Sequence, residues 1–193
     1  MPTVYCSLLT ARRITKGWLD GYTVHQHQHR TGPTPETVTA LLTQLRATHD
    51  NYETMIAPYS EEALHRRPAP GEWSGVEVIA HLADLDLFNR TERYNVILNE
   101  AGSDAPNLPA YDPDARIAAA NYQALTATDA LQLFKTERDT VVMLFEGLRP
   151  HEWARIGIHP TRGPQTLFEM ATTLAGHDQM HMGQLQAAVG TAV

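Results

Sequence analysis

The chain alternates stretches of helical apolar periodicity with proline-rich connections, and this alternation restricts the fold more than any other feature. Apolar side chains recur every three or four residues, the spacing that places them on one face of a helix. The periodicity predicts helices over residues 35–56, 74–99, 113–125, 128–148 and 166–189, and no stretch shows the two-residue alternation of a strand. The chain is therefore predicted to be all-α, a four-helix bundle with one additional short helix.

Two helix starts are marked by capping boxes. Ser74 and Glu77 form an S-x-x-E pattern before the second long helix, and Thr166 and Glu169 stand at the same spacing before the last one. In this pattern each side chain accepts a hydrogen bond from the backbone N–H of the other residue. We therefore expect both helices to begin sharply at these positions.

The remaining segments predict one domain and one extension. Residues 60–72 are expected to form a loop with one helical turn, and residues 149–165 a second irregular stretch. The connection over residues 99–127 is long enough to cross the bundle, so simple up-down-up-down order does not follow. Residues 1–33 are interpreted as a loosely packed N-terminal extension, and residues 34–193 as the bundle domain.

Charge and cysteine content exclude several classes of protein. A net charge of -7 without a cluster of Lys and Arg argues against nucleic acid as a partner. A single cysteine, Cys6, excludes an intrachain disulfide and a thiolate-rich metal site. The apolar patch over residues 4–9 is too short to span a membrane and does not have the order of a secretory signal. We expect a cytoplasmic protein without membrane partners.

Three histidines fall on helix faces that should be apolar. At about 100° of rotation per residue, His81 lies among the apolar side chains of the second long helix. His177 and His181 lie one turn apart within the apolar face of the last helix. An unpaired buried polar group costs about 1–3 kcal/mol, so imidazoles at these positions need hydrogen bonds or coordination.

The spacing of these histidines favours one shared metal ion. The H-x-x-x-H pattern of His177 and His181 lets two imidazoles on one helix hold a single ion, and His81 can supply a third ligand. Three neutral imidazoles leave a divalent cation at least one open position, as in catalytic sites. They suit zinc, nickel, copper or iron, with zinc favoured by its availability. The alternative is three histidines that are satisfied separately.

Two further polar residues are predicted to face the bundle interior. Arg138 lies among apolar residues of its helix, and Glu92 follows His81 by eleven residues on the same side. An ion pair between Glu92 and Arg138 is the simpler interpretation. In the alternative, functional interpretation, Arg138 anchors an anionic substrate.

Carboxylates beside the histidines are candidates for orienting them. Asp84 or Asp178 could hold the second ring nitrogen of a ligand imidazole, as carboxylates commonly do at metal sites. For Asp178, capping or solvent exposure is an equal alternative. Glu92, Asp84 and Gln184 are candidates for a general base, and none has a distinguishing pattern.

Other features are given a structural interpretation. His25, His27 and His29 alternate with glutamines and could bind metal loosely, but they are better explained as part of the extension. Trp73 is interpreted as a packing residue beside its capping box. Cys6 lies outside the periodic region with no candidate base near it, which argues against a nucleophile.

Four fragments of the chain resemble the DinB/YfiT-like superfamily of metal-binding four-helix bundles, over about residues 34–188. They occur in the family's order and are Pro68-Ala-Pro-Gly-Glu-Trp73-Ser, His81-Leu-Ala-Asp84, His159-Pro-Thr-Arg-Gly-Pro-Gln-Thr166-Leu and His177-Asp-Gln-Met-His181-Met-Gly-Gln184. The resemblance implies that His81, His177 and His181 occupy the family's three metal-ligand positions. It also implies a homodimer, and it does not extend to the residues before Pro33.

The resemblance implies a divalent-metal-dependent enzyme that acts on a small molecule. Transfer of a low-molecular-weight thiol is favoured, because characterised members of the family include thiol-dependent S-transferases and a mycothiol-dependent isomerase. Since Cys6 is badly placed, the sulfur would come from a cosubstrate whose thiolate the metal stabilises. The alternatives are a hydrolase in which the metal activates water, and a bundle that binds metal or ligand without catalysis.

Overall fold

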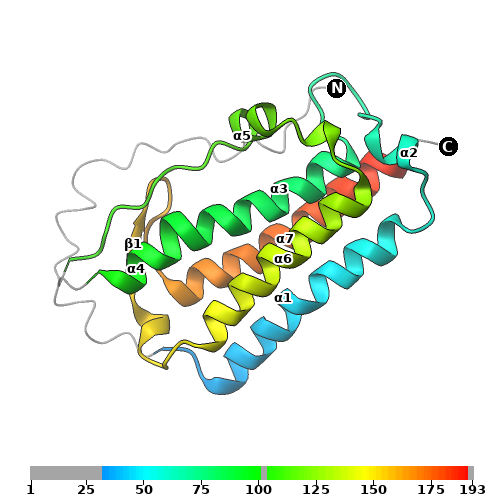
Figure 1. The fold of residues 1–193 in the computed structure, drawn as a ribbon. Coiled ribbons are helices and arrows are strands. Elements are labelled where there is room, and N and C mark those ends of the chain that lie inside the picture. The colour runs from blue at the N-terminus through cyan, green and yellow to red at the C-terminus, as the bar shows by residue number, and fades with distance from the viewer. Residues whose placement is uncertain (1–31, 101–103, 191–193) are drawn as a thin grey trace.

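A computed structural model of the protein describes residues 32–100 and 104–190. Its long helical segments run side by side along the molecule (Figure 1). They are α1 (Pro35–Ile56), α3 (Gly75–Phe88) with its continuation α4 (Asn95–Asn99), α6 (Ala127–Glu146) and α7 (Leu167–Gly190). The predicted helical bundle is confirmed.

Both capping boxes form. The Ser74 hydroxyl accepts a hydrogen bond from the Glu77 backbone N–H, and the Glu77 carboxylate accepts one from the Ser74 N–H. At α7, the Thr166 N–H donates to the Glu169 carboxylate at 2.7 Å, and the Glu169 N–H donates to the Thr166 hydroxyl at 3.1 Å. These bonds satisfy backbone donors that would otherwise be free, and they fix where the two histidine-bearing helices begin.

The apolar core fixes how these two helices face each other. One of its clusters includes Val78 and Leu82, which flank His81 in α3. The same cluster includes Leu185, one turn after His181 in α7. Burying these side chains together brings the histidine-bearing turns of α3 and α7 to the same level of the bundle.

Short helices occupy the connections. A helical turn, α2 (Glu61–His65), interrupts the first connection, as predicted. The predicted short helix over residues 113–125 is instead α5 (Pro113–Ala120) followed by a 3-10 turn, η4 (Tyr122–Ala124). Asn121 ends α5 in the left-handed region with φ 51. Another 3-10 turn, η5 (Glu152–Ala154), precedes α7.

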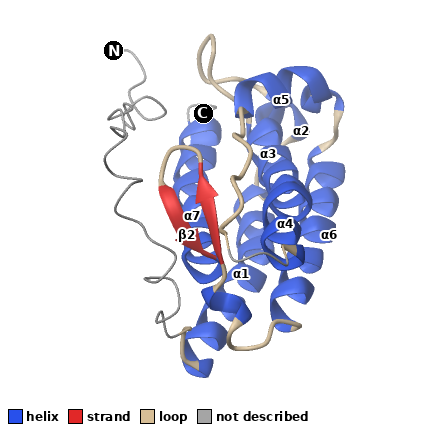
Figure 2. Ribbon diagram, turned by 90° about the vertical axis from the view of Figure 1, so that its left-hand side faces the viewer, coloured by secondary structure: helices blue, strands red, loops and turns tan. Residues whose placement is uncertain are grey.

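The structure adds one small β-hairpin that the sequence pattern did not indicate. Strands β1 (Ile156–His159) and β2 (Gly163–Thr166) form an antiparallel hairpin (Figure 2). Residues 106–108 extend it, because the Leu108 N–H donates to the Ile158 carbonyl at 2.9 Å and the Ile158 N–H donates to the Pro106 carbonyl at 2.8 Å. Four-residue strands are too short to produce a detectable alternation, so the sequence pattern missed them.

The second long helix contains an irregularity that the sequence did not indicate. Between α3 and α4, the six residues Asn89–Tyr94 form a π-helix, η3. A π-turn is wider than an α-turn, so it takes in extra chain and rotates the residues that follow. Arg93 is buried here and Glu92 is exposed, so the prediction that Glu92 faces the interior is wrong.

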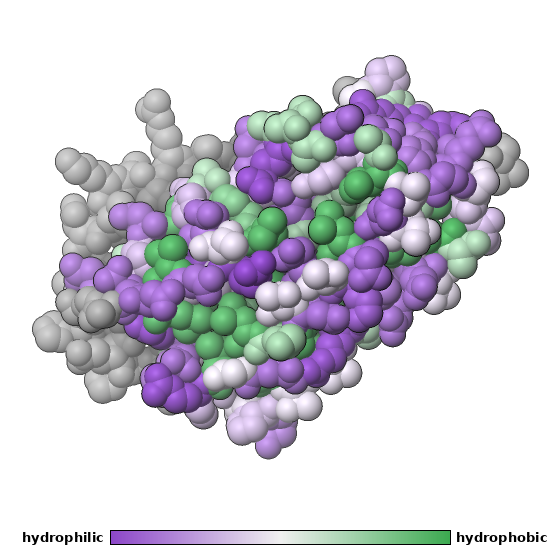
Figure 3. Space-filling model, viewed as in Figure 1, coloured by the Kyte–Doolittle hydropathy of each residue, from purple (hydrophilic) through white to green (hydrophobic). Residues whose placement is uncertain are grey.

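Hydrophilic side chains cover much of the face shown in Figure 3, with apolar patches between them. Met143 and Met180 are the most exposed large apolar side chains among the described residues, at 70% and 54%. Within the described part of the chain, no helix has the length and apolar character needed to cross a bilayer. The homodimer remains a prediction.

Candidate metal centre

The structure brings His81, His177 and His181 together. The Nε2 atom of His177 lies 3.4 Å from Nε2 of His81 and 3.0 Å from Nε2 of His181. One potential ligand atom from each of the three lies within 4.8 Å of the others. The side chains of α3 and α7 thus converge through the same ring nitrogen, on one point inside the bundle.

Burial keeps these imidazoles neutral. His81 and His181 are 2% and 5% exposed, and His177 is half-buried. Loss of hydration, helped by the neighbouring His181, lowers the pKa of His81 from 6.5 to about 3. The same causes, with His81 added, lower the pKa of His177 to about 2, and burial also lowers the pKa of His181. All three side chains are therefore neutral at physiological pH.

A hydrogen-bond relay fixes the tautomer of His81. The Tyr111 hydroxyl donates to Asp84 Oδ2 at 2.7 Å and lies 3.1 Å from His81 Nδ1. Because the single hydroxyl proton goes to Asp84, the Nδ1–H of His81 donates to the Tyr111 oxygen. Arg116 holds Asp84 in turn, with Nε 2.5 Å from Oδ2 and Nη2 2.6 Å from Oδ1. Asp84 thus acts on His81 through Tyr111.

Gln184 fixes the tautomer of His181 in the same way. Its Oε1 lies 2.6 Å from His181 Nδ1 and can only accept, so Nδ1 carries the proton. The Nδ1 atom of His177 is buried and has no hydrogen-bond partner in the part of the chain that the structure describes. His81 and His181 therefore both present an Nε2 lone pair to His177.

This donor set fits a divalent cation. Without a metal, His177, whose Nδ1 has no partner among the described residues, can keep its one ring proton on Nε2 and share it with His181 or His81. With that proton on Nδ1, its Nε2 offers a third lone pair beside those of His81 and His181. Three nitrogens bound to a tetrahedral zinc ion at 2.0–2.1 Å would lie about 3.3 Å apart. The separations of 3.4 and 3.0 Å from His177 Nε2 are close to that value.

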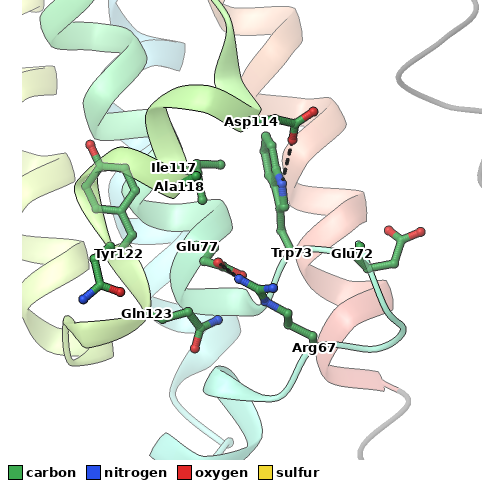
Figure 4. A pocket seen from close by; sticks show the side chains of 11 residues that line it. Arg67, Glu72, Trp73, Glu77, Asp114, Ile117, Ala118, Tyr122 and Gln123 are labelled. Atoms are coloured by element: carbon green, nitrogen blue, oxygen red, sulfur yellow. Dashed lines mark hydrogen bonds and ion pairs between the residues drawn. The ribbon is translucent and has the colours of Figure 1, made fainter.

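Trp73 covers the histidines. Its ring lies 6.0 Å from that of His181 with an interplanar angle of 8°, and 4.9 Å from that of His81. The indole N–H donates to Asp114 of α5 at 3.2 Å. Trp73 also lines a pocket of about 300 Å³, whose wall includes Tyr122 (Figure 4). The packing role predicted for Trp73 is therefore incomplete, because it also forms one wall of the site.

The predicted ion pair between Glu92 and Arg138 is wrong. Arg138 is 1% exposed and contacts Asp86 and Asp178, with its Nε 2.7 Å from Asp86 Oδ2 and its Nη1 2.5 Å from Asp178 Oδ2. Burial opposes the charge of Arg138, but the two carboxylates outweigh it and raise the pKa of the guanidinium. With two counter-charges, Arg138 is not free to anchor a substrate.

Asp178 neither orients a ligand imidazole nor faces solvent. The side chain is fully buried, accepts from Thr48 Oγ1 at 3.3 Å and pairs with Arg138. No hydrogen bond joins it to the three imidazoles within the described ranges. Solvent exposure is excluded, and the carboxylate serves the interior ion pair.

Neither Tyr111 nor Arg116 carried a signal in the sequence. Both belong to the connection between α4 and α6, Tyr111 just before helix α5 and Arg116 within it. Their roles depend on how this connection folds back over α3, which no local pattern encodes. Cys6 and the His25, His27 and His29 tract lie outside the described residues.

Comparison with known proteins shows the family and the fold. The profile of the DinB superfamily matches residues 44–185. A solved structure, YfiT from Bacillus subtilis, superposes with a TM-score of 0.71 at 19% identity, over 82% of this chain and 89% of that one. YfiT is described as a probable metal-dependent hydrolase with an unusual four-helix bundle topology. A search of curated proteins gave no match.

Proposed function

The chain belongs to the DinB superfamily, and we propose that it is a divalent-metal-dependent enzyme whose ion is held by His81, His177 and His181. The convergence of three Nε2 atoms, two of them with fixed tautomers, carries this proposal. Zinc is the favoured ion, and nickel or another transition metal is compatible with three imidazoles.

The residues around the ion have separate tasks. Tyr111 and Gln184 hold two imidazoles with their Nε2 lone pairs facing inward. Trp73 shields the site from water. A bound divalent ion with an open position supplies Lewis-acid activation, lowering the pKa of a small nucleophile such as a thiol or water.

Transfer of a low-molecular-weight thiol is the reaction we favour. Hydrolysis by water generally uses a carboxylate or imidazole as general base. Here Asp84 is bound by Arg116 and Tyr111, Asp178 is bound by Arg138, and no carboxylate joins the three-histidine group in the described structure. A thiol, with a pKa of about 8.5 against about 15.7 for water, would ionise more readily at the ion and release its proton to solvent. Hydrolysis is the alternative, which the description of YfiT supports.

Metal analysis of the full chain, purified without added metal, tests the first step. We expect about one equivalent of a divalent transition metal per chain, and its loss in His177→Ala. His151→Ala is the matched control, because His151 is exposed and lies outside the group. Wild-type protein without stoichiometric metal, which also fails to take up zinc, would overturn the proposal.

Activity then separates catalysis from a structural use of the ion. Thiol consumption with several electrophiles and hydrolysis of several esters are measured for wild type and His177→Ala. Lost turnover with an unchanged thermal melt supports catalysis. If His177→Ala loses much thermal stability and the wild-type protein shows no turnover, the chain is a metal-binding bundle that is not an enzyme.

A further inference from the structure

Arg93 is a buried guanidinium without a counter-charge. It is 6% exposed, and its hydrogen bonds go to the Pro109 carbonyl, from Nε at 3.2 Å and Nη2 at 2.9 Å, and to Asn89 Oδ1, from Nη1 at 3.0 Å. These bonds use three of the five N–H groups of an arginine. No carboxylate of the described residues pairs with Arg93, whereas Arg138, which is 1% exposed, has two.

An uncompensated charge inside a protein is costly, because a neutral carbonyl or amide does not replace hydration or a counter-ion. The side chain lies within the π-helix η3, whose wider turn changes which residues face inward. Single π-turns are often found at functional sites. The chain thus uses an irregular helix to bury a cation that it does not neutralise.

The β-hairpin brings two more donors to the same region. Gly157 of β1 packs so closely on Ile97 of α4 and on Leu108 that an added Cβ would lie 2.7 Å from a Leu108 carbon. At the other end of β1, the Nδ1 of His159 accepts from the backbone N–H of Thr161 at 3.3 Å, so its Nε2 carries the proton. Arg162 follows in the hairpin turn, and no ion pair to it occurs among the described residues.

Hydrogen bonds link these groups to one another. The Arg162 backbone N–H donates to His159 Nδ1 at 3.4 Å. Arg93 donates to Pro109, and Leu108 next to Pro109 pairs with Ile158 next to His159. Burial and the charges of Arg93 and Arg162 lower the pKa of His159 to about 4. Arg162 also contributes to the lowered pKa of His177. Arg93 lies over the ring of Phe88, 5.0 Å from its centroid, and Phe88 contacts Tyr111 of the relay.

We infer that Arg93, His159 and Arg162 bind an anionic oxygen group of the substrate, a carboxylate or a phosphate, beside the three-histidine site. This inference rests on the proposed function only in treating the bound anion as part of a substrate. The anion site itself does not depend on the metal. Guanidinium groups recognise both oxyanions through paired N–H donors. The bound anion would supply the counter-charge that the fold leaves out.

The competing role for Arg93 is a clamp that holds Pro109 to η3. A clamp needs the guanidinium but makes no use of Arg162, which is exposed on the hairpin turn. Arg162→Glu therefore separates the two roles without removing a buried group. Arg66→Glu is the matched control, since Arg66 is an exposed arginine beyond the short helix α2.

Isothermal titration of the full chain with sodium acetate and with inorganic phosphate tests the inference. Each titration is made on zinc-loaded protein and on protein treated with a chelator. We expect saturable binding of at least one anion in both preparations, about tenfold weaker in Arg162→Glu and within about twofold of wild type in Arg66→Glu. Acetate alone would identify a carboxylate, and phosphate alone a phosphoryl group.

Arg93→Lys keeps the charge but loses the planar fork, so about tenfold weaker binding is expected there as well. Absence of saturable binding, or binding unchanged in Arg162→Glu, would overturn the inference. Binding that requires zinc would also overturn it, because the anion would then be a ligand of the metal. Anion binding by a chain that never takes up metal would instead contradict the proposed function and leave the anion site standing.

Discussion

Hydrogen bonds to Nδ1 decide which nitrogen each histidine offers. Tyr111 and Gln184 place a proton on the outer nitrogen of His81 and His181, so the inner nitrogens are bare. The two supports come from different elements, since Gln184 follows His181 in its own helix and Tyr111 lies in a distant connection. The geometry of the site thus depends on residues outside the three-histidine group.

Removing the Tyr111 hydroxyl should weaken metal binding. Tyr111→Phe leaves the ring in place but lets His81 change tautomer or rotate, and the loss of such a support typically costs about 10–100-fold in affinity. Zinc affinity measured by competition with a chromophoric chelator is expected to fall by about tenfold. Tyr59→Phe is the control, because Tyr59 packs on the apolar core and no hydrogen bond joins it to the three histidines among the described residues. Equal affinities in the two variants would contradict the relay.

The lowered histidine pKa values predict that acid destabilises the metal-free protein. His81 and His177 titrate near pH 3 and 2 when folded and near 6.5 when unfolded. Between these values the unfolded chain binds more protons, so the free energy of unfolding falls as the pH falls from about 6.5 toward 3. Urea unfolding with a chelator present, repeated across this range, measures the slope. His177→Gln should show a shallower slope than wild type, and an unchanged slope would be evidence against neutral burial.

At the scale of single elements, capping and helix irregularity set the positions of the site residues. The capping box of α3 fixes its first turn, and His81 follows one turn after Glu77. Further along, η3 changes which residues face inward. The two features explain why the start of this helix follows the sequence pattern and its end does not.

Loss of the Ser74 cap should destabilise the fold measurably. Ser74 is fully buried, caps α3 and also accepts from Gln123 Nε2 at 2.7 Å. Ser74→Ala is expected to lower the free energy of unfolding by about 1–2 kcal/mol. Ser60→Ala, at the start of the short exposed helix α2, should have a smaller effect in the same denaturant titration. A larger loss of stability in Ser60→Ala than in Ser74→Ala would contradict the importance of the Ser74 cap.

The sequence could predict the helices and the grouping of three histidines, because regular periodicity holds up to His81 and throughout α7. It could not predict that Arg93 rather than Glu92 faces inward, since both lie within the π-helix η3, where α-helical turn counting does not apply. Tyr111 carried no signal, because its role is set by contacts across the bundle. The ion pair of Arg138 was misassigned for the same reason, as its partners lie on other helices.

At the scale of the whole molecule, Arg138 ties the long helices together. From α6 it bonds Asp86 of α3, Asp178 of α7 and the carbonyl of Leu45 in α1, the last at 3.3 Å. Buried ion pairs of this kind contribute little over apolar packing, but breaking one is expensive. The interaction therefore specifies the relative placement of helices more than it adds stability.

Replacing Arg138 alone should be strongly destabilising. Arg138→Met leaves Asp86 and Asp178 buried without a counter-charge, which is expected to cost about 3–5 kcal/mol. Arg46→Met removes an exposed partner of Glu146 and should change stability little. Adding Asp86→Asn and Asp178→Asn to Arg138→Met should recover part of the loss. Chemical denaturation of wild type and the three variants measures these changes in the free energy of unfolding. A mild effect of Arg138→Met would argue against a role for Arg138 in holding the helices together.

The segment from Pro106 to Tyr122 lies beside the bundle rather than within it. It pairs with β1 through Asn107, meets the histidines through Tyr111 and holds Trp73 through Asp114. The helices can therefore keep their interior unchanged while substitutions in this one segment alter the surroundings of the three histidines. A lineage built on this scaffold can diversify its chemistry along a single exchangeable stretch of chain without refolding the rest.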